Sequence, residues 1–155
     1  MNTFYNENCL TCQSVQGIIN LSKYQRIHES KYWVVEHMSP CAIKGWIVVA
    51  LKRHCTGLHE LNADEFMNFA QITRNICLTM KCLQNSEKEY VMQFAEKDRF
   101  GHVHFHVISR LSDWPQELKG INIFNAINSS VCPPIMDDEL EKYVIDFKKH
   151  FNSIL

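Results

Sequence analysis

Three histidines alternate with apolar residues in the second half of the sequence: His102, His104 and His106 are separated by Val103 and Phe105. Alternate residues of a β-strand share one face of a sheet, so the three imidazoles are expected to project together. Neutral imidazole is both a nucleophile near pH 7 and a common metal ligand. The array therefore predicts nucleophilic catalysis, metal binding, or a division of both tasks among the three rings. The remaining interpretation is a polar strand face that uses histidine in place of the more usual Thr, Lys or Glu.

Cys9 and Cys12 form the second group that could do chemistry. Their two-residue gap suits two ligands of one metal ion or a redox pair, and two ordinary buried thiols are a third interpretation. The redox interpretation lacks the βαβ context of thioredoxin-like proteins. The seven cysteines are an odd number and are scattered along the chain, which argues against a disulfide framework.

These groups must be positioned by a small number of elements. Aromatic and β-branched runs predict four strands, at residues 32–36, 46–51, 90–94 and 102–109. Asn62 and Glu65 resemble a capping box at the start of one long helix, and a last helix is expected to begin near Asp137. The pattern predicts an α+β fold with a mainly antiparallel sheet, one long helix and a C-terminal helix, in a single domain over residues 1–155. The sheet face opposite the helix is expected to be open and to hold the site.

The composition limits the kinds of molecule that the protein is expected to bind. The net charge of −1 and the pI near 6.7 argue against a protein that binds nucleic acid or an anionic membrane through a strongly basic surface. No apolar run approaches the length of a membrane span, and the N-terminus lacks the pattern of a targeting segment. These features predict a cytoplasmic protein.

The segment 101–108 resembles the signature of the histidine-triad (HIT) superfamily, in which the middle of three alternating histidines attacks the α-phosphorus of a nucleotide. The resemblance covers about residues 9–114, because further motifs follow the family's order at 36–40, 45–49, 52–54 and 58–61. It implies a nucleotide hydrolase or transferase of the histidine-triad fold that forms a homodimer. Residues 113–120 are similar to the tail of a zinc-bearing bacterial branch described as dinucleoside polyphosphate hydrolase-like, which favours a diadenosine polyphosphate or a related conjugate as substrate.

Carried over residue by residue, the resemblance makes His104 the nucleophile and His106 the contact to the reacting phosphate. It also implies a structural zinc site of the closed Cys₂His₂ type, with the ligands Cys9, Cys12, His54 and His102. The other three histidines have no matching role and are interpreted as surface or structural residues: His28, His59 and His150.

The chain departs from the family pattern at several positions. Trp46 stands where many members have a fourth active-site histidine, and is expected to stack on a base or, more commonly for a strand tryptophan, to pack in the core. The Ser or Thr that serves the leaving group is absent from the loop before the triad, where Arg99 could supply a cation instead, or be a solvated loop residue. The position of the ribose-binding acid or amide is occupied by His37, and Gln93 is a candidate contact to a phosphate oxygen.

These departures leave alternatives to the polyphosphate hydrolase. One is a nucleoside phosphoramidase, and another is a zinc-stabilised nucleotide-binding protein whose catalysis is weak. A nucleic-acid end-processing enzyme of the aprataxin kind is disfavoured by the near-neutral charge.

Overall fold

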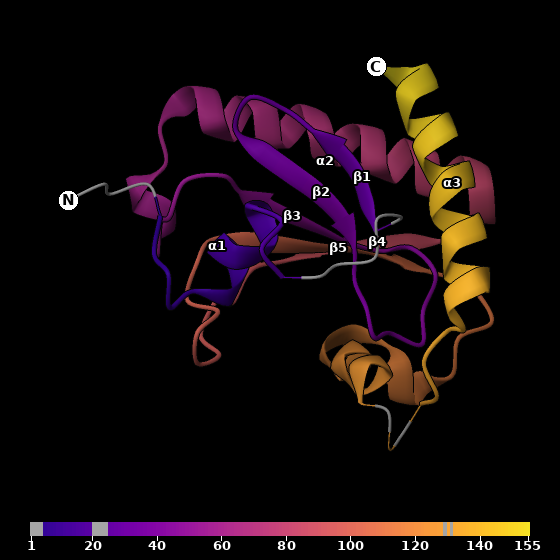
Figure 1. Cartoon of the computed structure of the whole chain (residues 1–155). Helices are drawn as coiled ribbons and strands as arrows, with labels where there is room; N and C mark the ends of the chain where they lie inside the picture. The colour runs from indigo at the N-terminus through magenta and orange to yellow at the C-terminus, as the bar shows by residue number, and fades with distance from the viewer. Residues whose placement is uncertain (1–4, 20–24, 129, 131) are drawn as a thin grey trace.

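The computed structural model describes residues 5–19, 25–128, 130 and 132–155, and is built around a five-stranded sheet (Figure 1). The strands lie in the order β1-β2-β3-β5-β4, and each neighbouring pair is antiparallel. Their bounds are β1 (Arg26–Glu29), β2 (Trp33–His37), β3 (Trp46–Leu51), β4 (Lys88–Met92) and β5 (His104–Arg110). The expected antiparallel α+β fold is confirmed. The strand expected from residue 102 begins at His104, and β1 was missed because it is only four residues long.

Two long helices cover one face of this sheet. The helix α2 (Ala63–Gln84) begins with the expected capping box, in which the Asn62 side chain accepts a hydrogen bond from the Glu65 backbone N–H. In Figure 1, α2 runs behind β1 and β2, and α3 (Asp137–Ile154) stands beside the sheet. The apolar stripe of α3 is buried in the core as its spacing predicts: Leu140, Val144, Phe147 and Phe151.

The strand register sorts side chains between the two faces. Val49 pairs with Val35 and Phe105, and all three lie in the core under the helices. Directly paired residues share a face, so the next row along β3 belongs to the opposite face. In that row Val48 pairs with Glu36 on one side and His106 on the other. His104 and His106 therefore lie on the face away from α2 and α3.

This second face is only partly open, which corrects the expectation of an uncovered face. The 3-10 helices η2 (Gln116–Leu118) and η3 (Gly120–Ile127) follow β5, and η3 packs Ile123 and Ala126 against Trp46 and Ile108 in a second apolar cluster. The short helix α1 (Leu10–Val15) covers another part, and a third 3-10 helix, η1 (Leu58–Glu60), precedes α2. These segments are too short to produce a clear periodic pattern.

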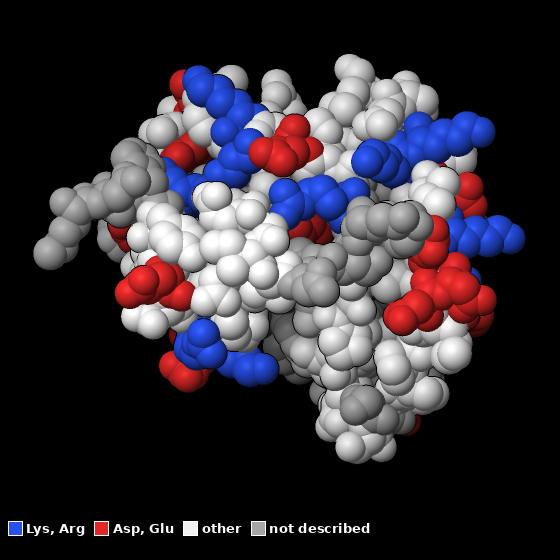
Figure 2. Space-filling view, in the orientation of Figure 1, with Lys and Arg blue, Asp and Glu red and all other residues white. Residues whose placement is uncertain are grey.

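The surface carries both signs of charge. Figure 2 shows lysines and arginines interspersed with aspartates and glutamates across the face that it presents. Among the described residues, none of the helices is both long and apolar enough to cross a membrane.

Candidate active site and metal-binding cluster

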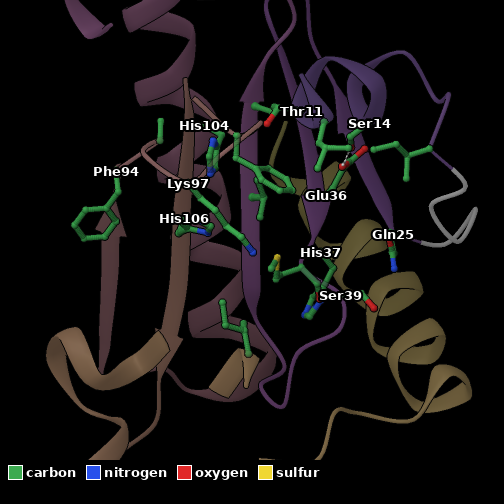
Figure 3. Close-up of a pocket in the computed structure, with 18 of the residues that line it drawn as sticks. Thr11, Ser14, Gln25, Glu36, His37, Ser39, Phe94, Lys97, His104 and His106 are labelled. Carbon is green, nitrogen blue, oxygen red and sulfur yellow. Dashed lines mark hydrogen bonds between the residues drawn. The ribbon is translucent and has the colours of Figure 1, made fainter. Parts of the chain in front are cut away.

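A cavity of about 510 Å³ opens on the second face of the sheet. Its floor is made of β-strand residues that include Val48, Ala50, His104 and His106, and its walls come from α1, from the loop after β4 and from η3. Figure 3 shows the two histidine rings on the same side of the cavity. Their centroids are 5.1 Å apart at an interplanar angle of 82°. The alternation of histidines thus brings two imidazoles into one concave site.

The tautomer of His104 follows from its backbone contact. The Nδ1–H group of this ring donates a hydrogen bond to the carbonyl oxygen of His102 at 2.7 Å. A neutral imidazole with its proton on Nδ1 carries a free lone pair on Nε2. Burial lowers the pKa of His104 below its ordinary value, which favours this neutral form. His104 is therefore prepared to act as a nucleophile through Nε2.

His106 has the opposite tautomer, because Trp46 is its partner. The indole Nε1–H of Trp46 donates a hydrogen bond to His106 Nδ1 at 2.9 Å. An indole nitrogen can only donate, so Nδ1 must be unprotonated and the proton of the neutral ring lies on Nε2. Burial, and secondarily the neighbouring His104, lower the pKa of His106 to about 4. His106 is therefore a neutral donor. Trp46 was expected to pack or to stack on a base, and this hydrogen bond across two strands was missed.

A polar group lies on the β2 side of the cavity. The hydroxyl of Ser14 donates a hydrogen bond to Glu36 Oε2 at 3.0 Å, and Arg26 Nε lies 2.7 Å from Glu36 Oε1. Burial raises the pKa of Glu36 above its ordinary value, against the opposing effects of Arg26 and Ser14. Glu36 was not among the residues expected from the sequence, because its place on the face of the triad follows from the register, in which Val48 pairs with both Glu36 and His106.

His37, the expected ribose contact, is turned away from this group. His37 pairs with Ile47, whose side chain lies in the helix-covered core, and its ring packs edge-on against Tyr143 of α3 at 5.6 Å. Its Nδ1–H donates to the Met38 carbonyl oxygen at 2.7 Å, while Nε2 accepts a hydrogen bond from the Gly45 N–H at 3.2 Å. His37 lines the cavity, but both of its ring nitrogens are occupied by main-chain groups. A ribose contact through His37 stays a prediction, and it would require one of these two hydrogen bonds to break.

The other two expected substrate contacts, Gln93 and Arg99, are not among the residues that line the cavity. Gln93 follows the end of β4, and Arg99 points toward the N-terminal segment, where its Nε donates to the Asn8 carbonyl oxygen at 3.2 Å. Ala95 and Arg99 both have positive φ angles, of 51° and 62°. The turn between them places Lys97, not Arg99, at the cavity wall (Figure 3). Nothing in the local composition distinguishes these two cations.

The four expected metal ligands come together beside β5. Cys12 Sγ lies 3.3 Å from the Nδ1 atoms of both His54 and His102, Cys9 Sγ lies 3.7 Å from His102 Nδ1, and all four donor atoms are within 4.8 Å of one another. Zn–S and Zn–N bonds of about 2.3 and 2.0 Å imply S···N edges of roughly 3.5 Å in a tetrahedron. His102 Nε2–H donates to the Leu51 carbonyl oxygen at 2.8 Å, which leaves Nδ1 free for a metal. The cluster fits a tetrahedral metal ion.

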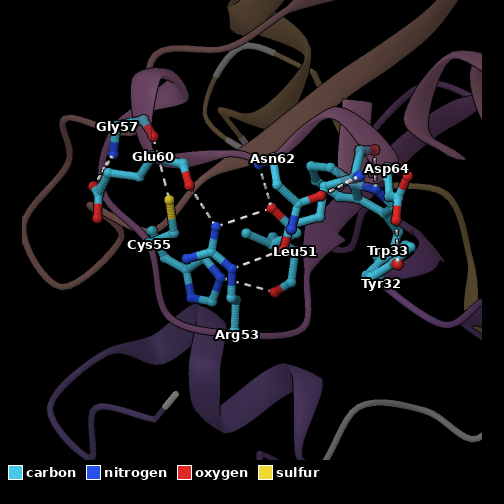
Figure 4. A network of polar contacts seen from close by, with 11 residues as sticks. Tyr32, Trp33, Leu51, Arg53, Cys55, Gly57, Glu60, Asn62 and Asp64 are labelled. Atoms are coloured by element: carbon cyan, nitrogen blue, oxygen red, sulfur yellow. Dashed lines mark hydrogen bonds and ion pairs between the residues drawn. The ribbon is translucent and has the colours of Figure 1, made fainter. Parts of the chain in front are cut away.

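A polar network fixes the backbone next to the ligand His54 (Figure 4). Arg53 forms two hydrogen bonds with the buried carboxylate of Glu65, at 2.7 and 2.9 Å, and a third with the Glu60 carbonyl oxygen at 2.7 Å. The hydrogen bonds to Arg53 lower the pKa of Glu65. Glu65 also accepts the Asn62 N–H at the start of α2. The segment that carries His54 is thereby tied to the first turn of the long helix.

An antiparallel sheet that presents alternating histidines to a cavity defines the class of histidine-triad proteins. The HIT domain family model matches residues 22–113, and the chain belongs to this family. No curated protein matches the chain at the sequence level.

Solved structures agree on the fold. A HIT-like protein from Bartonella henselae, described as involved in cell-cycle regulation, is 16% identical with a TM-score of 0.71, over 95% of this chain and 98% of that one. A zinc-bound histidine triad family protein from Mycobacterium smegmatis is 15% identical, with a TM-score of 0.66 and coverage of 94% of each chain. The diadenosine triphosphate hydrolase of Plasmodium falciparum, in complex with cyclomarin A, is 16% identical with a TM-score of 0.63, over 86% of this chain and 80% of that one.

Proposed function

We propose that this protein cleaves nucleoside polyphosphates or related conjugates at the α-phosphorus, through a covalent nucleotidyl intermediate on His104. The observation that carries the proposal is the hydrogen bond from His104 Nδ1–H to the His102 carbonyl, which leaves Nε2 free beside a neutral donor, His106. Membership of the HIT family and the fold shared with a diadenosine triphosphate hydrolase support it.

In the first half-reaction His104 Nε2 attacks the α-phosphorus. A P–N bond forms, the P–O bond to the leaving group breaks, and the leaving group departs with the bonding electron pair. The imidazole becomes positively charged as it bonds to phosphorus, and the His102 carbonyl oxygen stabilises that charge through Nδ1–H. His106 donates Nε2–H to a non-bridging phosphoryl oxygen. Two easier steps thus replace one difficult step.

In the second half-reaction water attacks the same phosphorus atom. A new P–O bond forms, the P–N bond breaks and returns its electron pair to His104 Nε2, and the proton of the water is released to solvent. The products are the nucleoside monophosphate and the free enzyme.

The residues in the cavity walls indicate where the nucleoside and the leaving group of the substrate would bind. The nucleoside extends from His106 toward β2, over Val48 and the Ser14–Glu36 pair. The leaving group extends toward the loop after β4, where Lys97 stands in place of the Arg99 expected from the sequence. A cation in this position favours an anionic polyphosphate leaving group over a neutral amine. The proposed substrate is therefore of the diadenosine polyphosphate type.

Cys9, Cys12, His54 and His102 are proposed to hold a structural zinc ion, supported by their donor geometry and by the zinc-bound relative from Mycobacterium smegmatis. A zinc ion bound by four protein ligands leaves no open position for substrate. Its contribution is to fix His102, whose carbonyl orients the nucleophile. A homodimer, which the family resemblance implies, stays a prediction.

The test compares His104→Asn with His150→Asn, a matched control on α3 that does not line the cavity. Release of AMP from diadenosine tetraphosphate is expected to fall by about three orders of magnitude or more in His104→Asn, because asparagine cannot form the intermediate. The control should retain wild-type turnover. Mass spectrometry of acid-labile nucleotide on the rapidly quenched wild-type enzyme identifies the intermediate.

Near-wild-type turnover by His104→Asn would refute the proposed nucleophile. A substrate panel separates the alternatives. Faster cleavage of adenosine phosphoramidate than of diadenosine tetraphosphate would identify a phosphoramidase. Tight AMP binding without turnover of either substrate would identify a nucleotide-binding protein.

A further inference from the structure

The loop between β4 and β5 contains a turn that places an arginine where glycine is usual. The Phe100 N–H donates a hydrogen bond to the Lys97 carbonyl oxygen at 2.8 Å, so residues 97–100 form a β-turn. Arg99 is the third residue of this turn and has a φ angle of 62°. A positive φ at this position favours glycine or asparagine, because a Cβ atom strains the left-handed conformation. Such strain persists only where the contacts of the residue over-determine its conformation.

Arg99 makes two contacts with the N-terminal segment, one on each side of Cys9. Its Nε–H donates a hydrogen bond to the Asn8 carbonyl oxygen at 3.2 Å. Its own carbonyl oxygen accepts a hydrogen bond from the Leu10 N–H at 2.9 Å. Leu10 is the first residue of α1, and the first N–H groups of a helix have no partner within the helix. Arg99 therefore holds the main chain both before and after a residue of the metal-binding cluster.

The same loop also leads into the metal-binding cluster. His102 follows Arg99 by three residues, and its Nδ1 lies 3.7 Å from Cys9 Sγ. A metal ion bound by Cys9 and His102 would fix the N-terminal segment against the end of the loop. The two hydrogen bonds of Arg99 join these same two segments. Metal binding and the Arg99 contacts should therefore reinforce each other, because both stabilise one arrangement of the two segments.

The turn also carries Lys97 at the cavity wall. The Lys97 Nζ atom lies over the Phe100 ring, 5.6 Å from its centroid, and both residues line the cavity. Figure 3 shows the Lys97 side chain among the residues that line the cavity with the two histidine rings. A lysine ammonium stands on a flexible stem, so its position depends on the backbone that carries it. Displacement of the turn would move this cation away from the leaving-group end of the cavity.

We propose that Arg99 is a positioning residue that couples the metal-binding cluster to the leaving-group end of the cavity: its two contacts beside Cys9 hold the turn, and the turn holds Lys97. The inference rests on the proposed function, because it takes an anionic leaving group as the partner of Lys97. The contacts of Arg99 raise the affinity of the cluster for its metal, and the choice of leaving group is linked to metal occupancy.

The first arm of the experiment measures the zinc affinity of the full chain by competition with a chelator dye. Arg99→Gly removes the guanidinium group but keeps the backbone carbonyl, and glycine adopts a positive φ without strain, so the turn is retained. This variant is expected to bind zinc about threefold or more weakly, the effect of one lost hydrogen bond. The control is Arg74→Ala, which removes an exposed arginine from α2 and should match wild type.

The second arm measures kcat/KM of the zinc-bound protein in a double-mutant cycle. For diadenosine tetraphosphate, Arg99→Gly is expected to lower kcat/KM about threefold, and to have no further effect in the Lys97→Ala background, because it acts through Lys97. Cleavage of adenosine phosphoramidate, which has no polyphosphate leaving group, should be unchanged in Arg99→Gly. General damage to the fold would slow the cleavage of both substrates.

Three outcomes would overturn the inference while leaving the proposed function intact. They are equal zinc affinities of Arg99→Gly and Arg74→Ala, effects of Arg99→Gly and Lys97→Ala on kcat/KM that multiply independently, and equal slowing of both substrates by Arg99→Gly. If zinc-bound wild type cleaves neither substrate, the proposed function is refuted, and the zinc affinity of Arg99→Gly alone decides whether Arg99 holds the metal-binding cluster.

Discussion

Replacement of Trp46 by phenylalanine isolates the hydrogen bond that sets the tautomer of His106. The substitution removes the indole N–H, which lies 2.9 Å from His106 Nδ1, and keeps an aromatic ring against Phe124, whose centroid is 5.5 Å away. Without this donor, the proton of His106 can occupy Nδ1, which leaves Nε2 unable to donate to a phosphoryl oxygen. The ring is no longer held in its productive form.

The magnitude follows from one buried hydrogen bond. Its loss costs about 1–2 kcal/mol, so kcat/KM is expected to fall about 5- to 30-fold. The pKa of His106 should also change. In the wild type, burial and His104 lower the pKa of His106 to about 4, and the indole donor disfavours a proton on Nδ1. Trp46→Phe removes only the effect of the indole and leaves burial in place, so the pKa of His106 should rise above its wild-type value.

The assay is kcat/KM for diadenosine tetraphosphate between pH 4 and 8, together with ring ¹⁵N chemical shifts of labelled histidine, which report the tautomer. The matched control is Trp33→Phe, because Trp33 is equally buried and its indole donates to the Glu65 carbonyl oxygen at 2.9 Å on the opposite face. Both variants should lose stability. If Trp46→Phe shows the same kcat/KM and the same histidine ring ¹⁵N shifts as Trp33→Phe, the role assigned to Trp46 is refuted.

Three further predictions follow from single residues. Lys97→Ala should lower kcat/KM for diadenosine tetraphosphate about five- to tenfold with little change for adenosine phosphoramidate, and an equal effect from the exposed Lys149→Ala would contradict this. Glu65→Ala should lower the free energy of unfolding by about 2 kcal/mol or more in urea titrations, because it leaves Arg53 and the start of α2 without their partner; a smaller loss would show that water replaces the carboxylate. Burial lowers the pKa of His37 to about 4 in the folded protein, so the unfolded chain binds more protons below pH 6.5 and stability falls as the pH drops from 6.5 to 4. His37→Gln should reduce this slope by up to about 1.4 kcal/mol per pH unit, and parallel slopes in the two proteins would reject the assignment.

The sequence by itself determined the features that depend on local periodicity. The alternation of His104 and His106 predicted that both rings share a face, and the capping residues Asn62 and Glu65 predicted the start of α2. The Cys9–Cys12 spacing allowed a shared metal site, which the family resemblance then implied. Each of these follows from the fixed repeat of a strand or a helix turn, or from the geometry of a short loop.

Only the tertiary structure decided which of two nearby residues has its side chain at the site. The choice between Glu36 and His37 depends on the cross-strand register, which a shift of one residue reverses. The choice between Lys97 and Arg99 depends on two left-handed residues in one loop. The partnership of Trp46 with His106 joins residues sixty positions apart. Helix α1 contributes Cys12 to the metal-binding cluster and Leu10 to the wall of the cavity. The sequence pattern cannot show this double placement, because it depends on contacts with segments that are distant along the chain.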